Sequence, residues 1–414
     1  MLVARVDPML GAEGAFALIE RISPALENVD SSSGAIGSAV NRTIAELVPV
    51  IVAAPADAST RAAWLERLFD AHGADQIPFI ERLAEYWGEL CGTAEVASAW
   101  ADRLISITSL ALSPDKNVRG YFHGTSACLS ALFAAGRHDE LIELVRGDVF
   151  WPYKRWAVKA MVAQGRHAEA IAFAESCRNP WASDQDIDGL CEGVLRSAGR
   201  MGEAYSRYAL TANRTHTYLG WFRAVAKKYP DKPRGGVLLD LVQLTPDDKG
   251  TWFAAAKDAK LFDEAVALAN RTPCDPKTLT RAARDFAEKN PAFAVEAGLA
   301  ALRWLVQGHG YEITSADVWA AYAHTIKAAA NAHRSNEVQD RIRALIDSAD
   351  VRGGFVANII GREVGLPLTW RGSRRIRLWD RQEPVLRRCS STPMTLITSA
   401  NVGTCPVIII VIAS

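Results

Sequence analysis

The sequence predicts an all-α protein, an α-solenoid of stacked antiparallel helix hairpins. Three observations predict it: a turn sequence recurs along the chain, several helices begin with a capping residue followed by proline, and no window alternates apolar and polar residues over several strands. One hairpin cannot bury its apolar face alone and must stack on its neighbours. A chain of 414 residues exceeds the usual size of one globular core, and a solenoid accommodates it by growing along one axis.

The recurring turn joins one apolar helical pattern to the next. Its four copies occupy residues 136–140, 165–170, 199–204 and 260–265, and three of them begin Gly-Arg. The copies start 29, 34 and 61 residues apart, and the last interval is about two repeats. Glycine at the first position can supply the left-handed cap that ends a helix. The spacing therefore predicts successive helix pairs.

The first part of the chain contains less regular helices. Apolar periodicity predicts them over 16–22, 36–52, 62–71, 78–91 and 96–112. We expect residues 1–110 to form an N-terminal helical segment that continues directly into a helical-repeat solenoid over 111–365.

Helix starts are clearer in the second half. Thr245, Asp275 and Asn290 each precede a proline, which then occupies the first helical position, where its missing N–H costs nothing. With the apolar face of 184–198, these starts predict the boundaries of later helices: 246–259, 276–289, 291–307, 314–333, 335–348 and one that ends near 365. In total we expect about seventeen helices in roughly eight or nine antiparallel pairs.

The repeat turns resemble a known family. The sequence Gly-Arg-x-x-Glu-Ala followed by Ile-Ala-Phe-Ala, and its echo at 263–269, resemble tetratricopeptide-type helical repeats. Residues 252–305 are similar to uncharacterised helical-repeat proteins of bacteria. The resemblance covers roughly 120–350 and implies architecture only, because the full tetratricopeptide consensus of Trp, Leu-Gly, Tyr and Pro is absent. No peptide-clamp residue is carried over.

The charge of the chain is unevenly distributed. Residues 371–414 contain seven arginines, no lysine and two acidic residues, a net of +5, so the rest carries 40 basic and 45 acidic side chains, a net of −5. A mildly acidic body disfavours general nucleic-acid binding. The composition also changes abruptly, and we expect 366–414 to be a basic extension that is disordered or translated out of frame. The alternative is a genuine basic tail.

Cellular location and cofactors follow from missing signals. Residues 1–24 show no signal-peptide pattern, and the longest apolar run, 407–413, is far shorter than the ~20 residues that span a bilayer. The seven cysteines are scattered without a Cys-x-x-Cys pair, and the eight histidines include no His-Glu-x-x-His. We therefore expect a cytoplasmic protein without a membrane partner, metal or cofactor, in which Cys177 and Cys191 are buried and Cys274 is inert.

Two histidines occupy equivalent places in the repeat turns. His138 and His167 both follow Gly-Arg, which argues for turn geometry rather than catalysis.

Aromatic and basic residues gather in two segments about 70 residues apart, near two repeat lengths. We expect Trp151, Tyr153, Arg155, Trp221 and Arg223 to contribute to binding, because Trp, Tyr and Arg are enriched at interface hot spots. The alternative is that the aromatic rings pack between adjacent hairpins.

The main hypothesis is a non-catalytic interaction or scaffold module that binds an unidentified protein or peptide on its repeat surface. One alternative is a helical small-molecule sensor or enzyme with a pocket near 151–223. Another is a nucleic-acid-binding helical repeat, which the acidic body disfavours.

Overall fold

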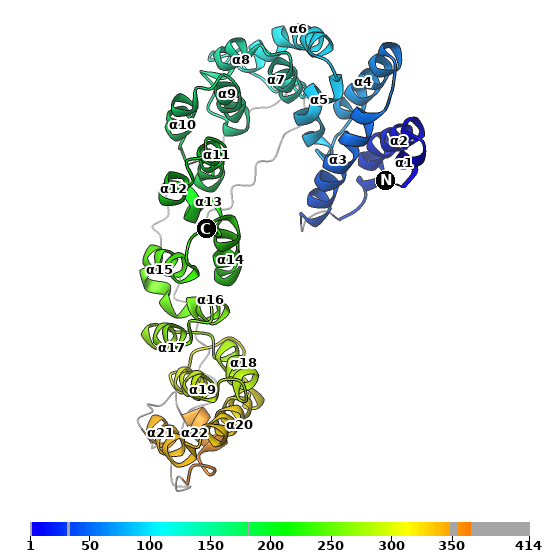
Figure 1. Cartoon of the computed structure of the whole chain (residues 1–414). Helices are drawn as coiled ribbons and strands as arrows, with labels where there is room; N and C mark the ends of the chain where they lie inside the picture. Colours follow the sequence, from blue (N-terminus) through cyan, green and yellow to red (C-terminus); the bar gives the residue numbers. More distant parts are fainter. Residues whose placement is uncertain (1, 31–33, 181, 348–353, 366–414) are drawn as a thin grey trace, which may run out of the picture.

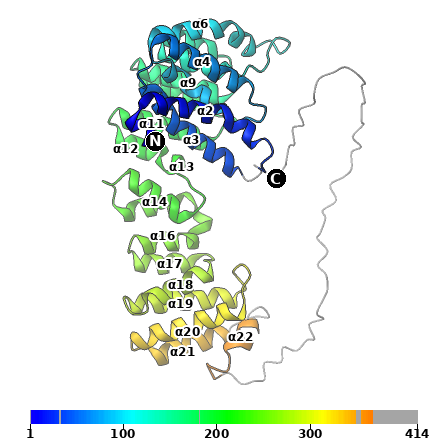
Figure 2. The ribbon, with the colours of Figure 1, turned by 90° about the vertical axis from the view of Figure 1, so that its right-hand side faces the viewer.

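The computed structural model describes residues 2–30, 34–180, 182–347 and 354–365. Every regular element in these ranges is a helix, which confirms the all-α prediction. The helices follow one another along a curved arc (Figure 1), and in the turned view the second half forms successive layers (Figure 2). The expected basic extension 366–414 lies outside the described residues.

The N-terminal part is a set of helices that wrap around apolar side chains such as Phe16, Leu68 and Trp87. Its elements are α1 (Leu2–Val6), α2 (Pro8–Leu26), α3 (Ala35–Ala53), α4 (Ala58–Gly73), the 3-10 helix η1 (Glu81–Tyr86), α5 (Trp87–Cys91) and α6 (Ala94–Ala111). Helix α6 then packs on α7, so the chain passes into the hairpin region without a break in its packing.

The single helix expected over 78–91 is wrong, because the structure divides this segment into η1 and α5. Ser130, from α7, causes the division. Its hydroxyl donates to the carbonyl of Glu85 and accepts from the N–H of Gly88, both at 2.9 Å. The side chain therefore replaces the backbone hydrogen bonds that one continuous helix would make.

The remaining helices alternate between the inside and the outside of the arc (Figure 1). The inner ones are α7 (Thr125–Ala134), α9 (Trp151–Ala163), α11 (Asp184–Ser197), α14 (Tyr218–Lys228), α16 (Phe253–Asp258), α18 (Pro276–Phe286) and α20 (Ser315–Asn331). The others are α8 (His138–Val145), α10 (His167–Ser176), α12 (Met201–Ala204), α13 (Leu210–Ala212), α15 (Arg234–Leu244), α17 (Phe262–Arg271), α19 (Pro291–Val306), α21 (Ser335–Asp347) and α22 (Gly354–Ile360). Helix α10 packs on α11, as expected for neighbouring hairpins.

The recurring turn has the expected left-handed geometry. Gly136, Gly165 and Gly199 have φ values of 74°, 78° and 74°. The residue after each glycine closes the helix end, as when the N–H of Arg166 donates to the carbonyl of Met161 at 2.8 Å. This backbone conformation costs a glycine little and reverses the chain between an inner and an outer helix.

A fifth copy of the turn begins at His333, which the sequence analysis did not identify. His333 has φ of 56°, close to the 62° of Lys260 in the fourth copy. Arg334 then pairs with Glu337, just as Arg137 pairs with Glu140 at 2.7 Å. This copy therefore shares the Arg-x-x-Glu pair with the three glycine copies and the left-handed non-glycine residue with the fourth, which has Leu261 in place of arginine.

The prediction of one helix over 246–259 is also wrong in part. The structure divides this segment into the 3-10 helix η3 (Pro246–Trp252) and α16. Asp248 leaves the helical conformation, with φ of −110° and ψ of 28°. Gly250 packs against the backbone of Thr272, where an added Cβ would lie 2.3 Å from a carbonyl oxygen. This close approach leaves no room for a side chain at position 250.

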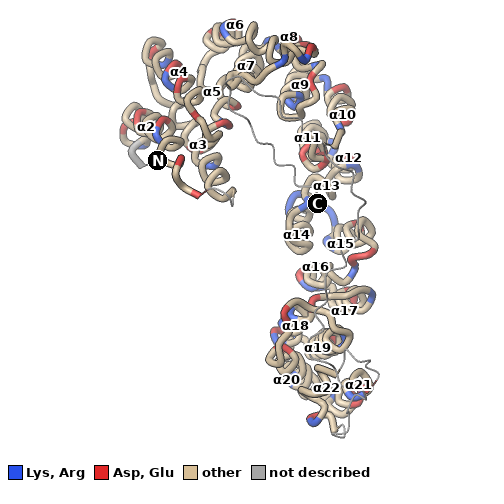
Figure 3. Tube along the Cα trace, turned by 180° about the vertical axis from the view of Figure 1, so that it is seen from behind, with Lys and Arg blue, Asp and Glu red and all other residues tan. Residues whose placement is uncertain are grey.

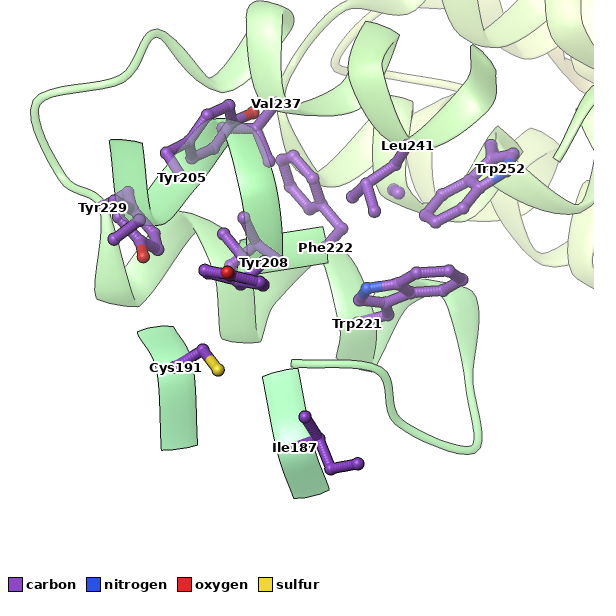
Figure 4. Close-up of a cluster of buried hydrophobic side chains, with 14 of the residues drawn as sticks. Ile187, Cys191, Tyr205, Tyr208, Trp221, Phe222, Tyr229, Val237, Leu241 and Trp252 are labelled. Carbon is purple, nitrogen blue, oxygen red and sulfur yellow. The ribbon is translucent and has the colours of Figure 1, made fainter. Parts of the chain in front are cut away.

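One junction in the arc differs from the others, and we call it the middle joint. It connects α11–α13 with α14–α15, whose backbones approach one another at few points. Within α12–α13, residues Tyr205–Ala209 form a π-helix, η2. Figure 4 shows the ring of Tyr208 next to Cys191, with Trp221 on its other side, and the rings of Tyr205 and Tyr229 pack together with centroids 5.2 Å apart. Side chains rather than close backbones therefore fill this junction.

Candidate binding surface

An apolar groove lies between the inner helices α7, α9 and α11, and we call it the inner groove. Its volume is about 360 Å³. Most of its lining is apolar and is contributed by Phe133, Val162, Ala163, Leu190 and Val194. A groove of this kind can take apolar side chains out of water, at roughly 25 cal/mol per Å² of buried apolar surface.

Two glycines form part of the wall of the inner groove. Gly189 and Gly193 lie one turn apart on α11, and a Cβ added at either would meet no atom within 4 Å. Packing within the described chain therefore does not require glycine here, although each costs about 1 kcal/mol relative to alanine in a helix interior. The missing side chains let another molecule approach the backbone of α11 closely.

Lys159 is the one charged residue among those that line the inner groove. Its Nζ lies 4.1 Å from the centroid of the Trp156 ring. Burial lowers the pKa of Lys159, and the neighbouring Arg155 guanidinium lowers that pKa further. A carboxylate at this wall of the groove would compensate both effects.

The two predicted tryptophans are buried. Trp151 is 6% exposed and Trp221 is 3% exposed. The indole N–H of Trp221 donates to the carbonyl of Leu210 at 2.7 Å, and its ring centroid lies 5.5 Å from that of Trp252. Their burial agrees with the alternative that these aromatics pack between hairpins, because a buried ring offers little surface to a partner.

The predicted arginines already have acidic partners. Arg155 pairs with Glu85 and Arg223 pairs with Asp258, each at 2.5 Å. Helix α11 lies between α9 and α14 (Figure 1), so the structure does not bring the two predicted segments together. Arg155 is nevertheless one turn before Lys159 on α9, beside the inner groove.

Tyr153 belongs to a different surface, which we call the loop patch. Its ring packs on Phe150 with centroids 5.0 Å apart. Phe150 is 51% exposed, and Val149 and Tyr121 are 71% and 82% exposed. Sequence reasoning missed Tyr121 because the two loops meet only in the folded chain, where Arg119 pairs with Asp148 at 2.6 Å.

The two turn histidines and the three cysteines named from the sequence occupy structural positions. His138 and His167 begin α8 and α10, in agreement with a turn role. Cys177, Cys191 and Cys274 are buried, and burial raises the pKa of Cys191 to about 11 and that of Cys274 to about 12. These two thiols therefore stay protonated near neutral pH. The described residues contain no cluster of three or more potential metal ligands.

Comparison with known protein families, curated proteins and solved structures finds no match to this chain. Within the described ranges, α3 is the one helix whose length and apolar composition could cross a membrane, and buried helices of soluble proteins share those properties.

Proposed function

We propose that this protein is a non-catalytic interaction module, an α-solenoid of tetratricopeptide-like hairpins that binds a segment of a partner protein in the inner groove. The observation that supports this proposal most directly is the groove itself, which is open, mainly apolar and bounded by Gly189 and Gly193. Contiguous apolar surface that no part of a soluble protein covers often marks an interaction site. Cytoplasmic residence stays a prediction.

Two features support the solenoid architecture. Helices alternate between the inside and outside of the arc (Figure 1), and the same left-handed turn recurs at Gly136, Gly165, Gly199, Lys260 and His333. In such a stack each hairpin contacts mainly its neighbours, and the inner helices form an extended binding surface.

The lining of the inner groove defines the chemistry of the partner segment. Apolar side chains of the segment would fill the space beside Leu190 and Val194, and an acidic side chain would face Lys159. Lys159 is exposed to solvent, so an ion pair there would orient the segment more than it would add to the binding free energy. We therefore expect a segment with several apolar residues and one carboxylate.

A steric variant tests this proposal. Gly193→Met places a flexible side chain in the inner groove, where the open space around the Cβ position allows the fold to persist. The matched control is Gly202→Met on α12, where an added Cβ also meets no atom within 4 Å. Segments selected from a random peptide-display library on the native protein are then measured against both variants by fluorescence anisotropy.

We expect the selected segments to carry apolar residues with one acid, to lose at least about tenfold in affinity for Gly193→Met, and to bind Gly202→Met as tightly as the native chain. Failure to enrich any segment, or equal binding to both variants, would contradict the proposal.

The volume of the inner groove favours one second candidate, a sensor of a small apolar molecule. About 360 Å³ lies within the range of roughly 300–1,000 Å³ for small-molecule sites. This candidate predicts binding of a solvatochromic dye that Gly193→Met abolishes, without enrichment of peptides. Basic and acidic positions are interspersed along the arc (Figure 3), which gives the nucleic-acid alternative no comparable support.

A further inference from the structure

A second depression, which we call the basic cleft, lies between α18 and α20 on the inner side of the arc. Its volume is about 200 Å³. Pro276, Leu305 and Ile313 contribute apolar lining, and the polar lining includes three cations and a histidine: Lys277, Arg281, Arg284 and His324. The cleft is separate from the inner groove, since the two share no lining residue.

Helix α18 presents the three cations together. Lys277, Arg281 and Arg284 are spaced four and three residues apart, which places them along one helix face. The opposite face of α18 buries Leu279 and Ala283 in the core. The position of the cationic face is therefore set by packing, and His324 adds a fourth nitrogen-bearing side chain from α20.

Arg281 is the cation that the described chain leaves without an acidic partner. Its guanidinium donates to the hydroxyl of Thr278 at 2.9 Å, and no ion pair joins it to a carboxylate within the described ranges. Arg284 pairs with its exposed neighbour Asp285 at 2.9 Å. The guanidinium groups of Arg281 and Arg284 therefore retain N–H groups that can donate hydrogen bonds to an oxyanion.

Asp317 is the acid in the lining, and other groups already engage it. Its carboxylate accepts from both the N–H and the hydroxyl of Thr314, each at 2.8 Å. The Nζ of Lys277 lies 3.7 Å from the same carboxylate and donates to the carbonyl of Glu312 at 3.1 Å. Asp317 thus offsets Lys277 and leaves the arginine end of the cleft positive.

The environment of His324 reflects this positive field. Burial lowers its pKa, and the charges of Arg284 and Lys327 lower that pKa further, against a smaller opposing effect of Asp285. The neutral imidazole can still donate one hydrogen bond from a ring N–H.

We propose that the basic cleft binds a phosphate monoester. A phosphate monoester carries about −1.5 to −2 charges at neutral pH and three strong acceptor oxygens. Arginine forks match this geometry, and donors from two helices surround one small volume. A single carboxylate would use only part of this donor set. The inference does not depend on the inner groove or on a protein partner.

Calorimetric titration of the full chain tests the proposal with three probes: a peptide that contains phosphoserine, glycerol 3-phosphate, and succinate as a doubly charged carboxylate. The variant is Arg281→Gln, which removes the cation without breaking an ion pair of the described chain. The control is Arg146→Gln, a surface arginine outside the cleft that is 67% exposed; this change removes the same charge and breaks only the exposed pair with Glu143. The arginine-rich residues 371–414 are the same in the native chain and both variants, so any binding of the probes to this segment contributes equally to the three titrations.

We expect saturable phosphate binding to the native chain and to Arg146→Gln, with at least about a tenfold loss in Arg281→Gln. If the phosphopeptide binds more tightly than glycerol 3-phosphate, the natural ligand is a phosphorylated protein segment. If glycerol 3-phosphate binds as tightly as the phosphopeptide or more tightly, the natural ligand is a small phosphate ester. The absence of saturable binding, equal affinity in Arg281→Gln, or equal affinity for succinate would overturn the proposal.

Discussion

Neighbouring hairpins are joined by different chemistry at the middle joint and in the stack of α18, α19 and α20. The stack is apolar and closely packed, and an added Cβ on Gly298 of α19 would lie 2.1 Å from the Thr325 hydroxyl of α20. At the middle joint, side-chain hydrogen bonds bridge backbones that approach at few points. Tyr229 donates to Glu192 at 2.7 Å, and Tyr205 donates to Asp240 at 2.6 Å.

This difference shows two ways of joining neighbouring helix pairs. Close apolar packing stabilises through many weak contacts summed over the contact area. A hydrogen bond to a buried carboxylate requires one geometry and is costly to break. Glu192 is fully buried and accepts from Tyr229, from Lys228 at 2.5 Å and from Asn213 at 3.0 Å. The middle joint is therefore sensitive to single polar substitutions, whereas the stack is sensitive to changes in volume.

The largest effect is expected when Glu192 loses its cation. Lys228→Met leaves the buried carboxylate without a positive partner, and breaking a buried pair in this way costs about 3–5 kcal/mol. The free energy of unfolding is measured by urea denaturation, with hydrogen exchange to locate the loss in α14. Lys227→Met, at the exposed neighbouring position, is the control and should change stability little.

A volume change should affect the stack instead. Gly298→Ala forces a methyl group into the contact with Thr325, and overpacking of this kind costs about 1–3 kcal/mol. The matched substitution is Gly193→Ala on α11, where the Cβ is unobstructed and better helix propensity should stabilise the chain by up to about 1 kcal/mol. Thermal unfolding distinguishes the two, and equal shifts would remove the contrast between them.

Some of the structural features behind these predictions could be predicted from the sequence, and others could not. The caps at Asp275 and Asn290 were predictable, since their side chains accept from the N–H groups of Thr278 and Phe293 as local sequence rules require. The glycine turns are local in the same way. The starts at Pro276 and Pro291 and the glycine reversals could therefore be predicted before the structure, whereas Thr245 makes no side-chain cap bond and the reversal at His333 was missed.

Features that depend on distant residues could not be predicted. The break between η1 and α5 is caused by Ser130, far along the chain, and the π-helix η2 brings Tyr205 to Asp240 of α15. For the candidate site, composition marked Trp151 and Trp221 but could not assign the face on which each ring lies. Gly189 and Gly193 carried a usable signal, because two glycines one turn apart are unfavourable in a helix that needs no close contact.

A smaller loss is expected from removal of one hydroxyl at the middle joint. Tyr205→Phe deletes the hydrogen bond to Asp240, and such a bond to a charged group contributes about 1.5–3 kcal/mol, less here because Asp240 is half-buried. The control is Tyr311→Phe, since Tyr311 is 80% exposed. If both variants unfold at the same urea concentration, the tyrosine bonds do not stabilise the joint.

The smallest effect concerns alkaline pH. Burial and the neighbouring carboxylates raise the pKa of Tyr205 and of Tyr229 above the ordinary value of 10. A raised pKa in the folded state means that the stabilisation is complete below pH 10 and is lost as the pH rises further. Melting temperatures across pH 9–11 should therefore fall, and the fall should be shallower in Tyr205→Phe. An identical slope in both chains would contradict this origin.

The position of the middle joint also determines how two ligand groups can be held at once. The helices that line the inner groove precede the joint and α18 and α20, which line the basic cleft, follow it; Figure 1 places both sets along the inner side of the arc. For a molecule that carries both an apolar segment and a phosphate, occupation of one site makes the second encounter intramolecular. Its effective concentration is highest when the connecting length matches the span between the sites. Under the two proposals above, the hydrogen bonds across the joint would fix the distance between the sites and so select the length of the connecting chain.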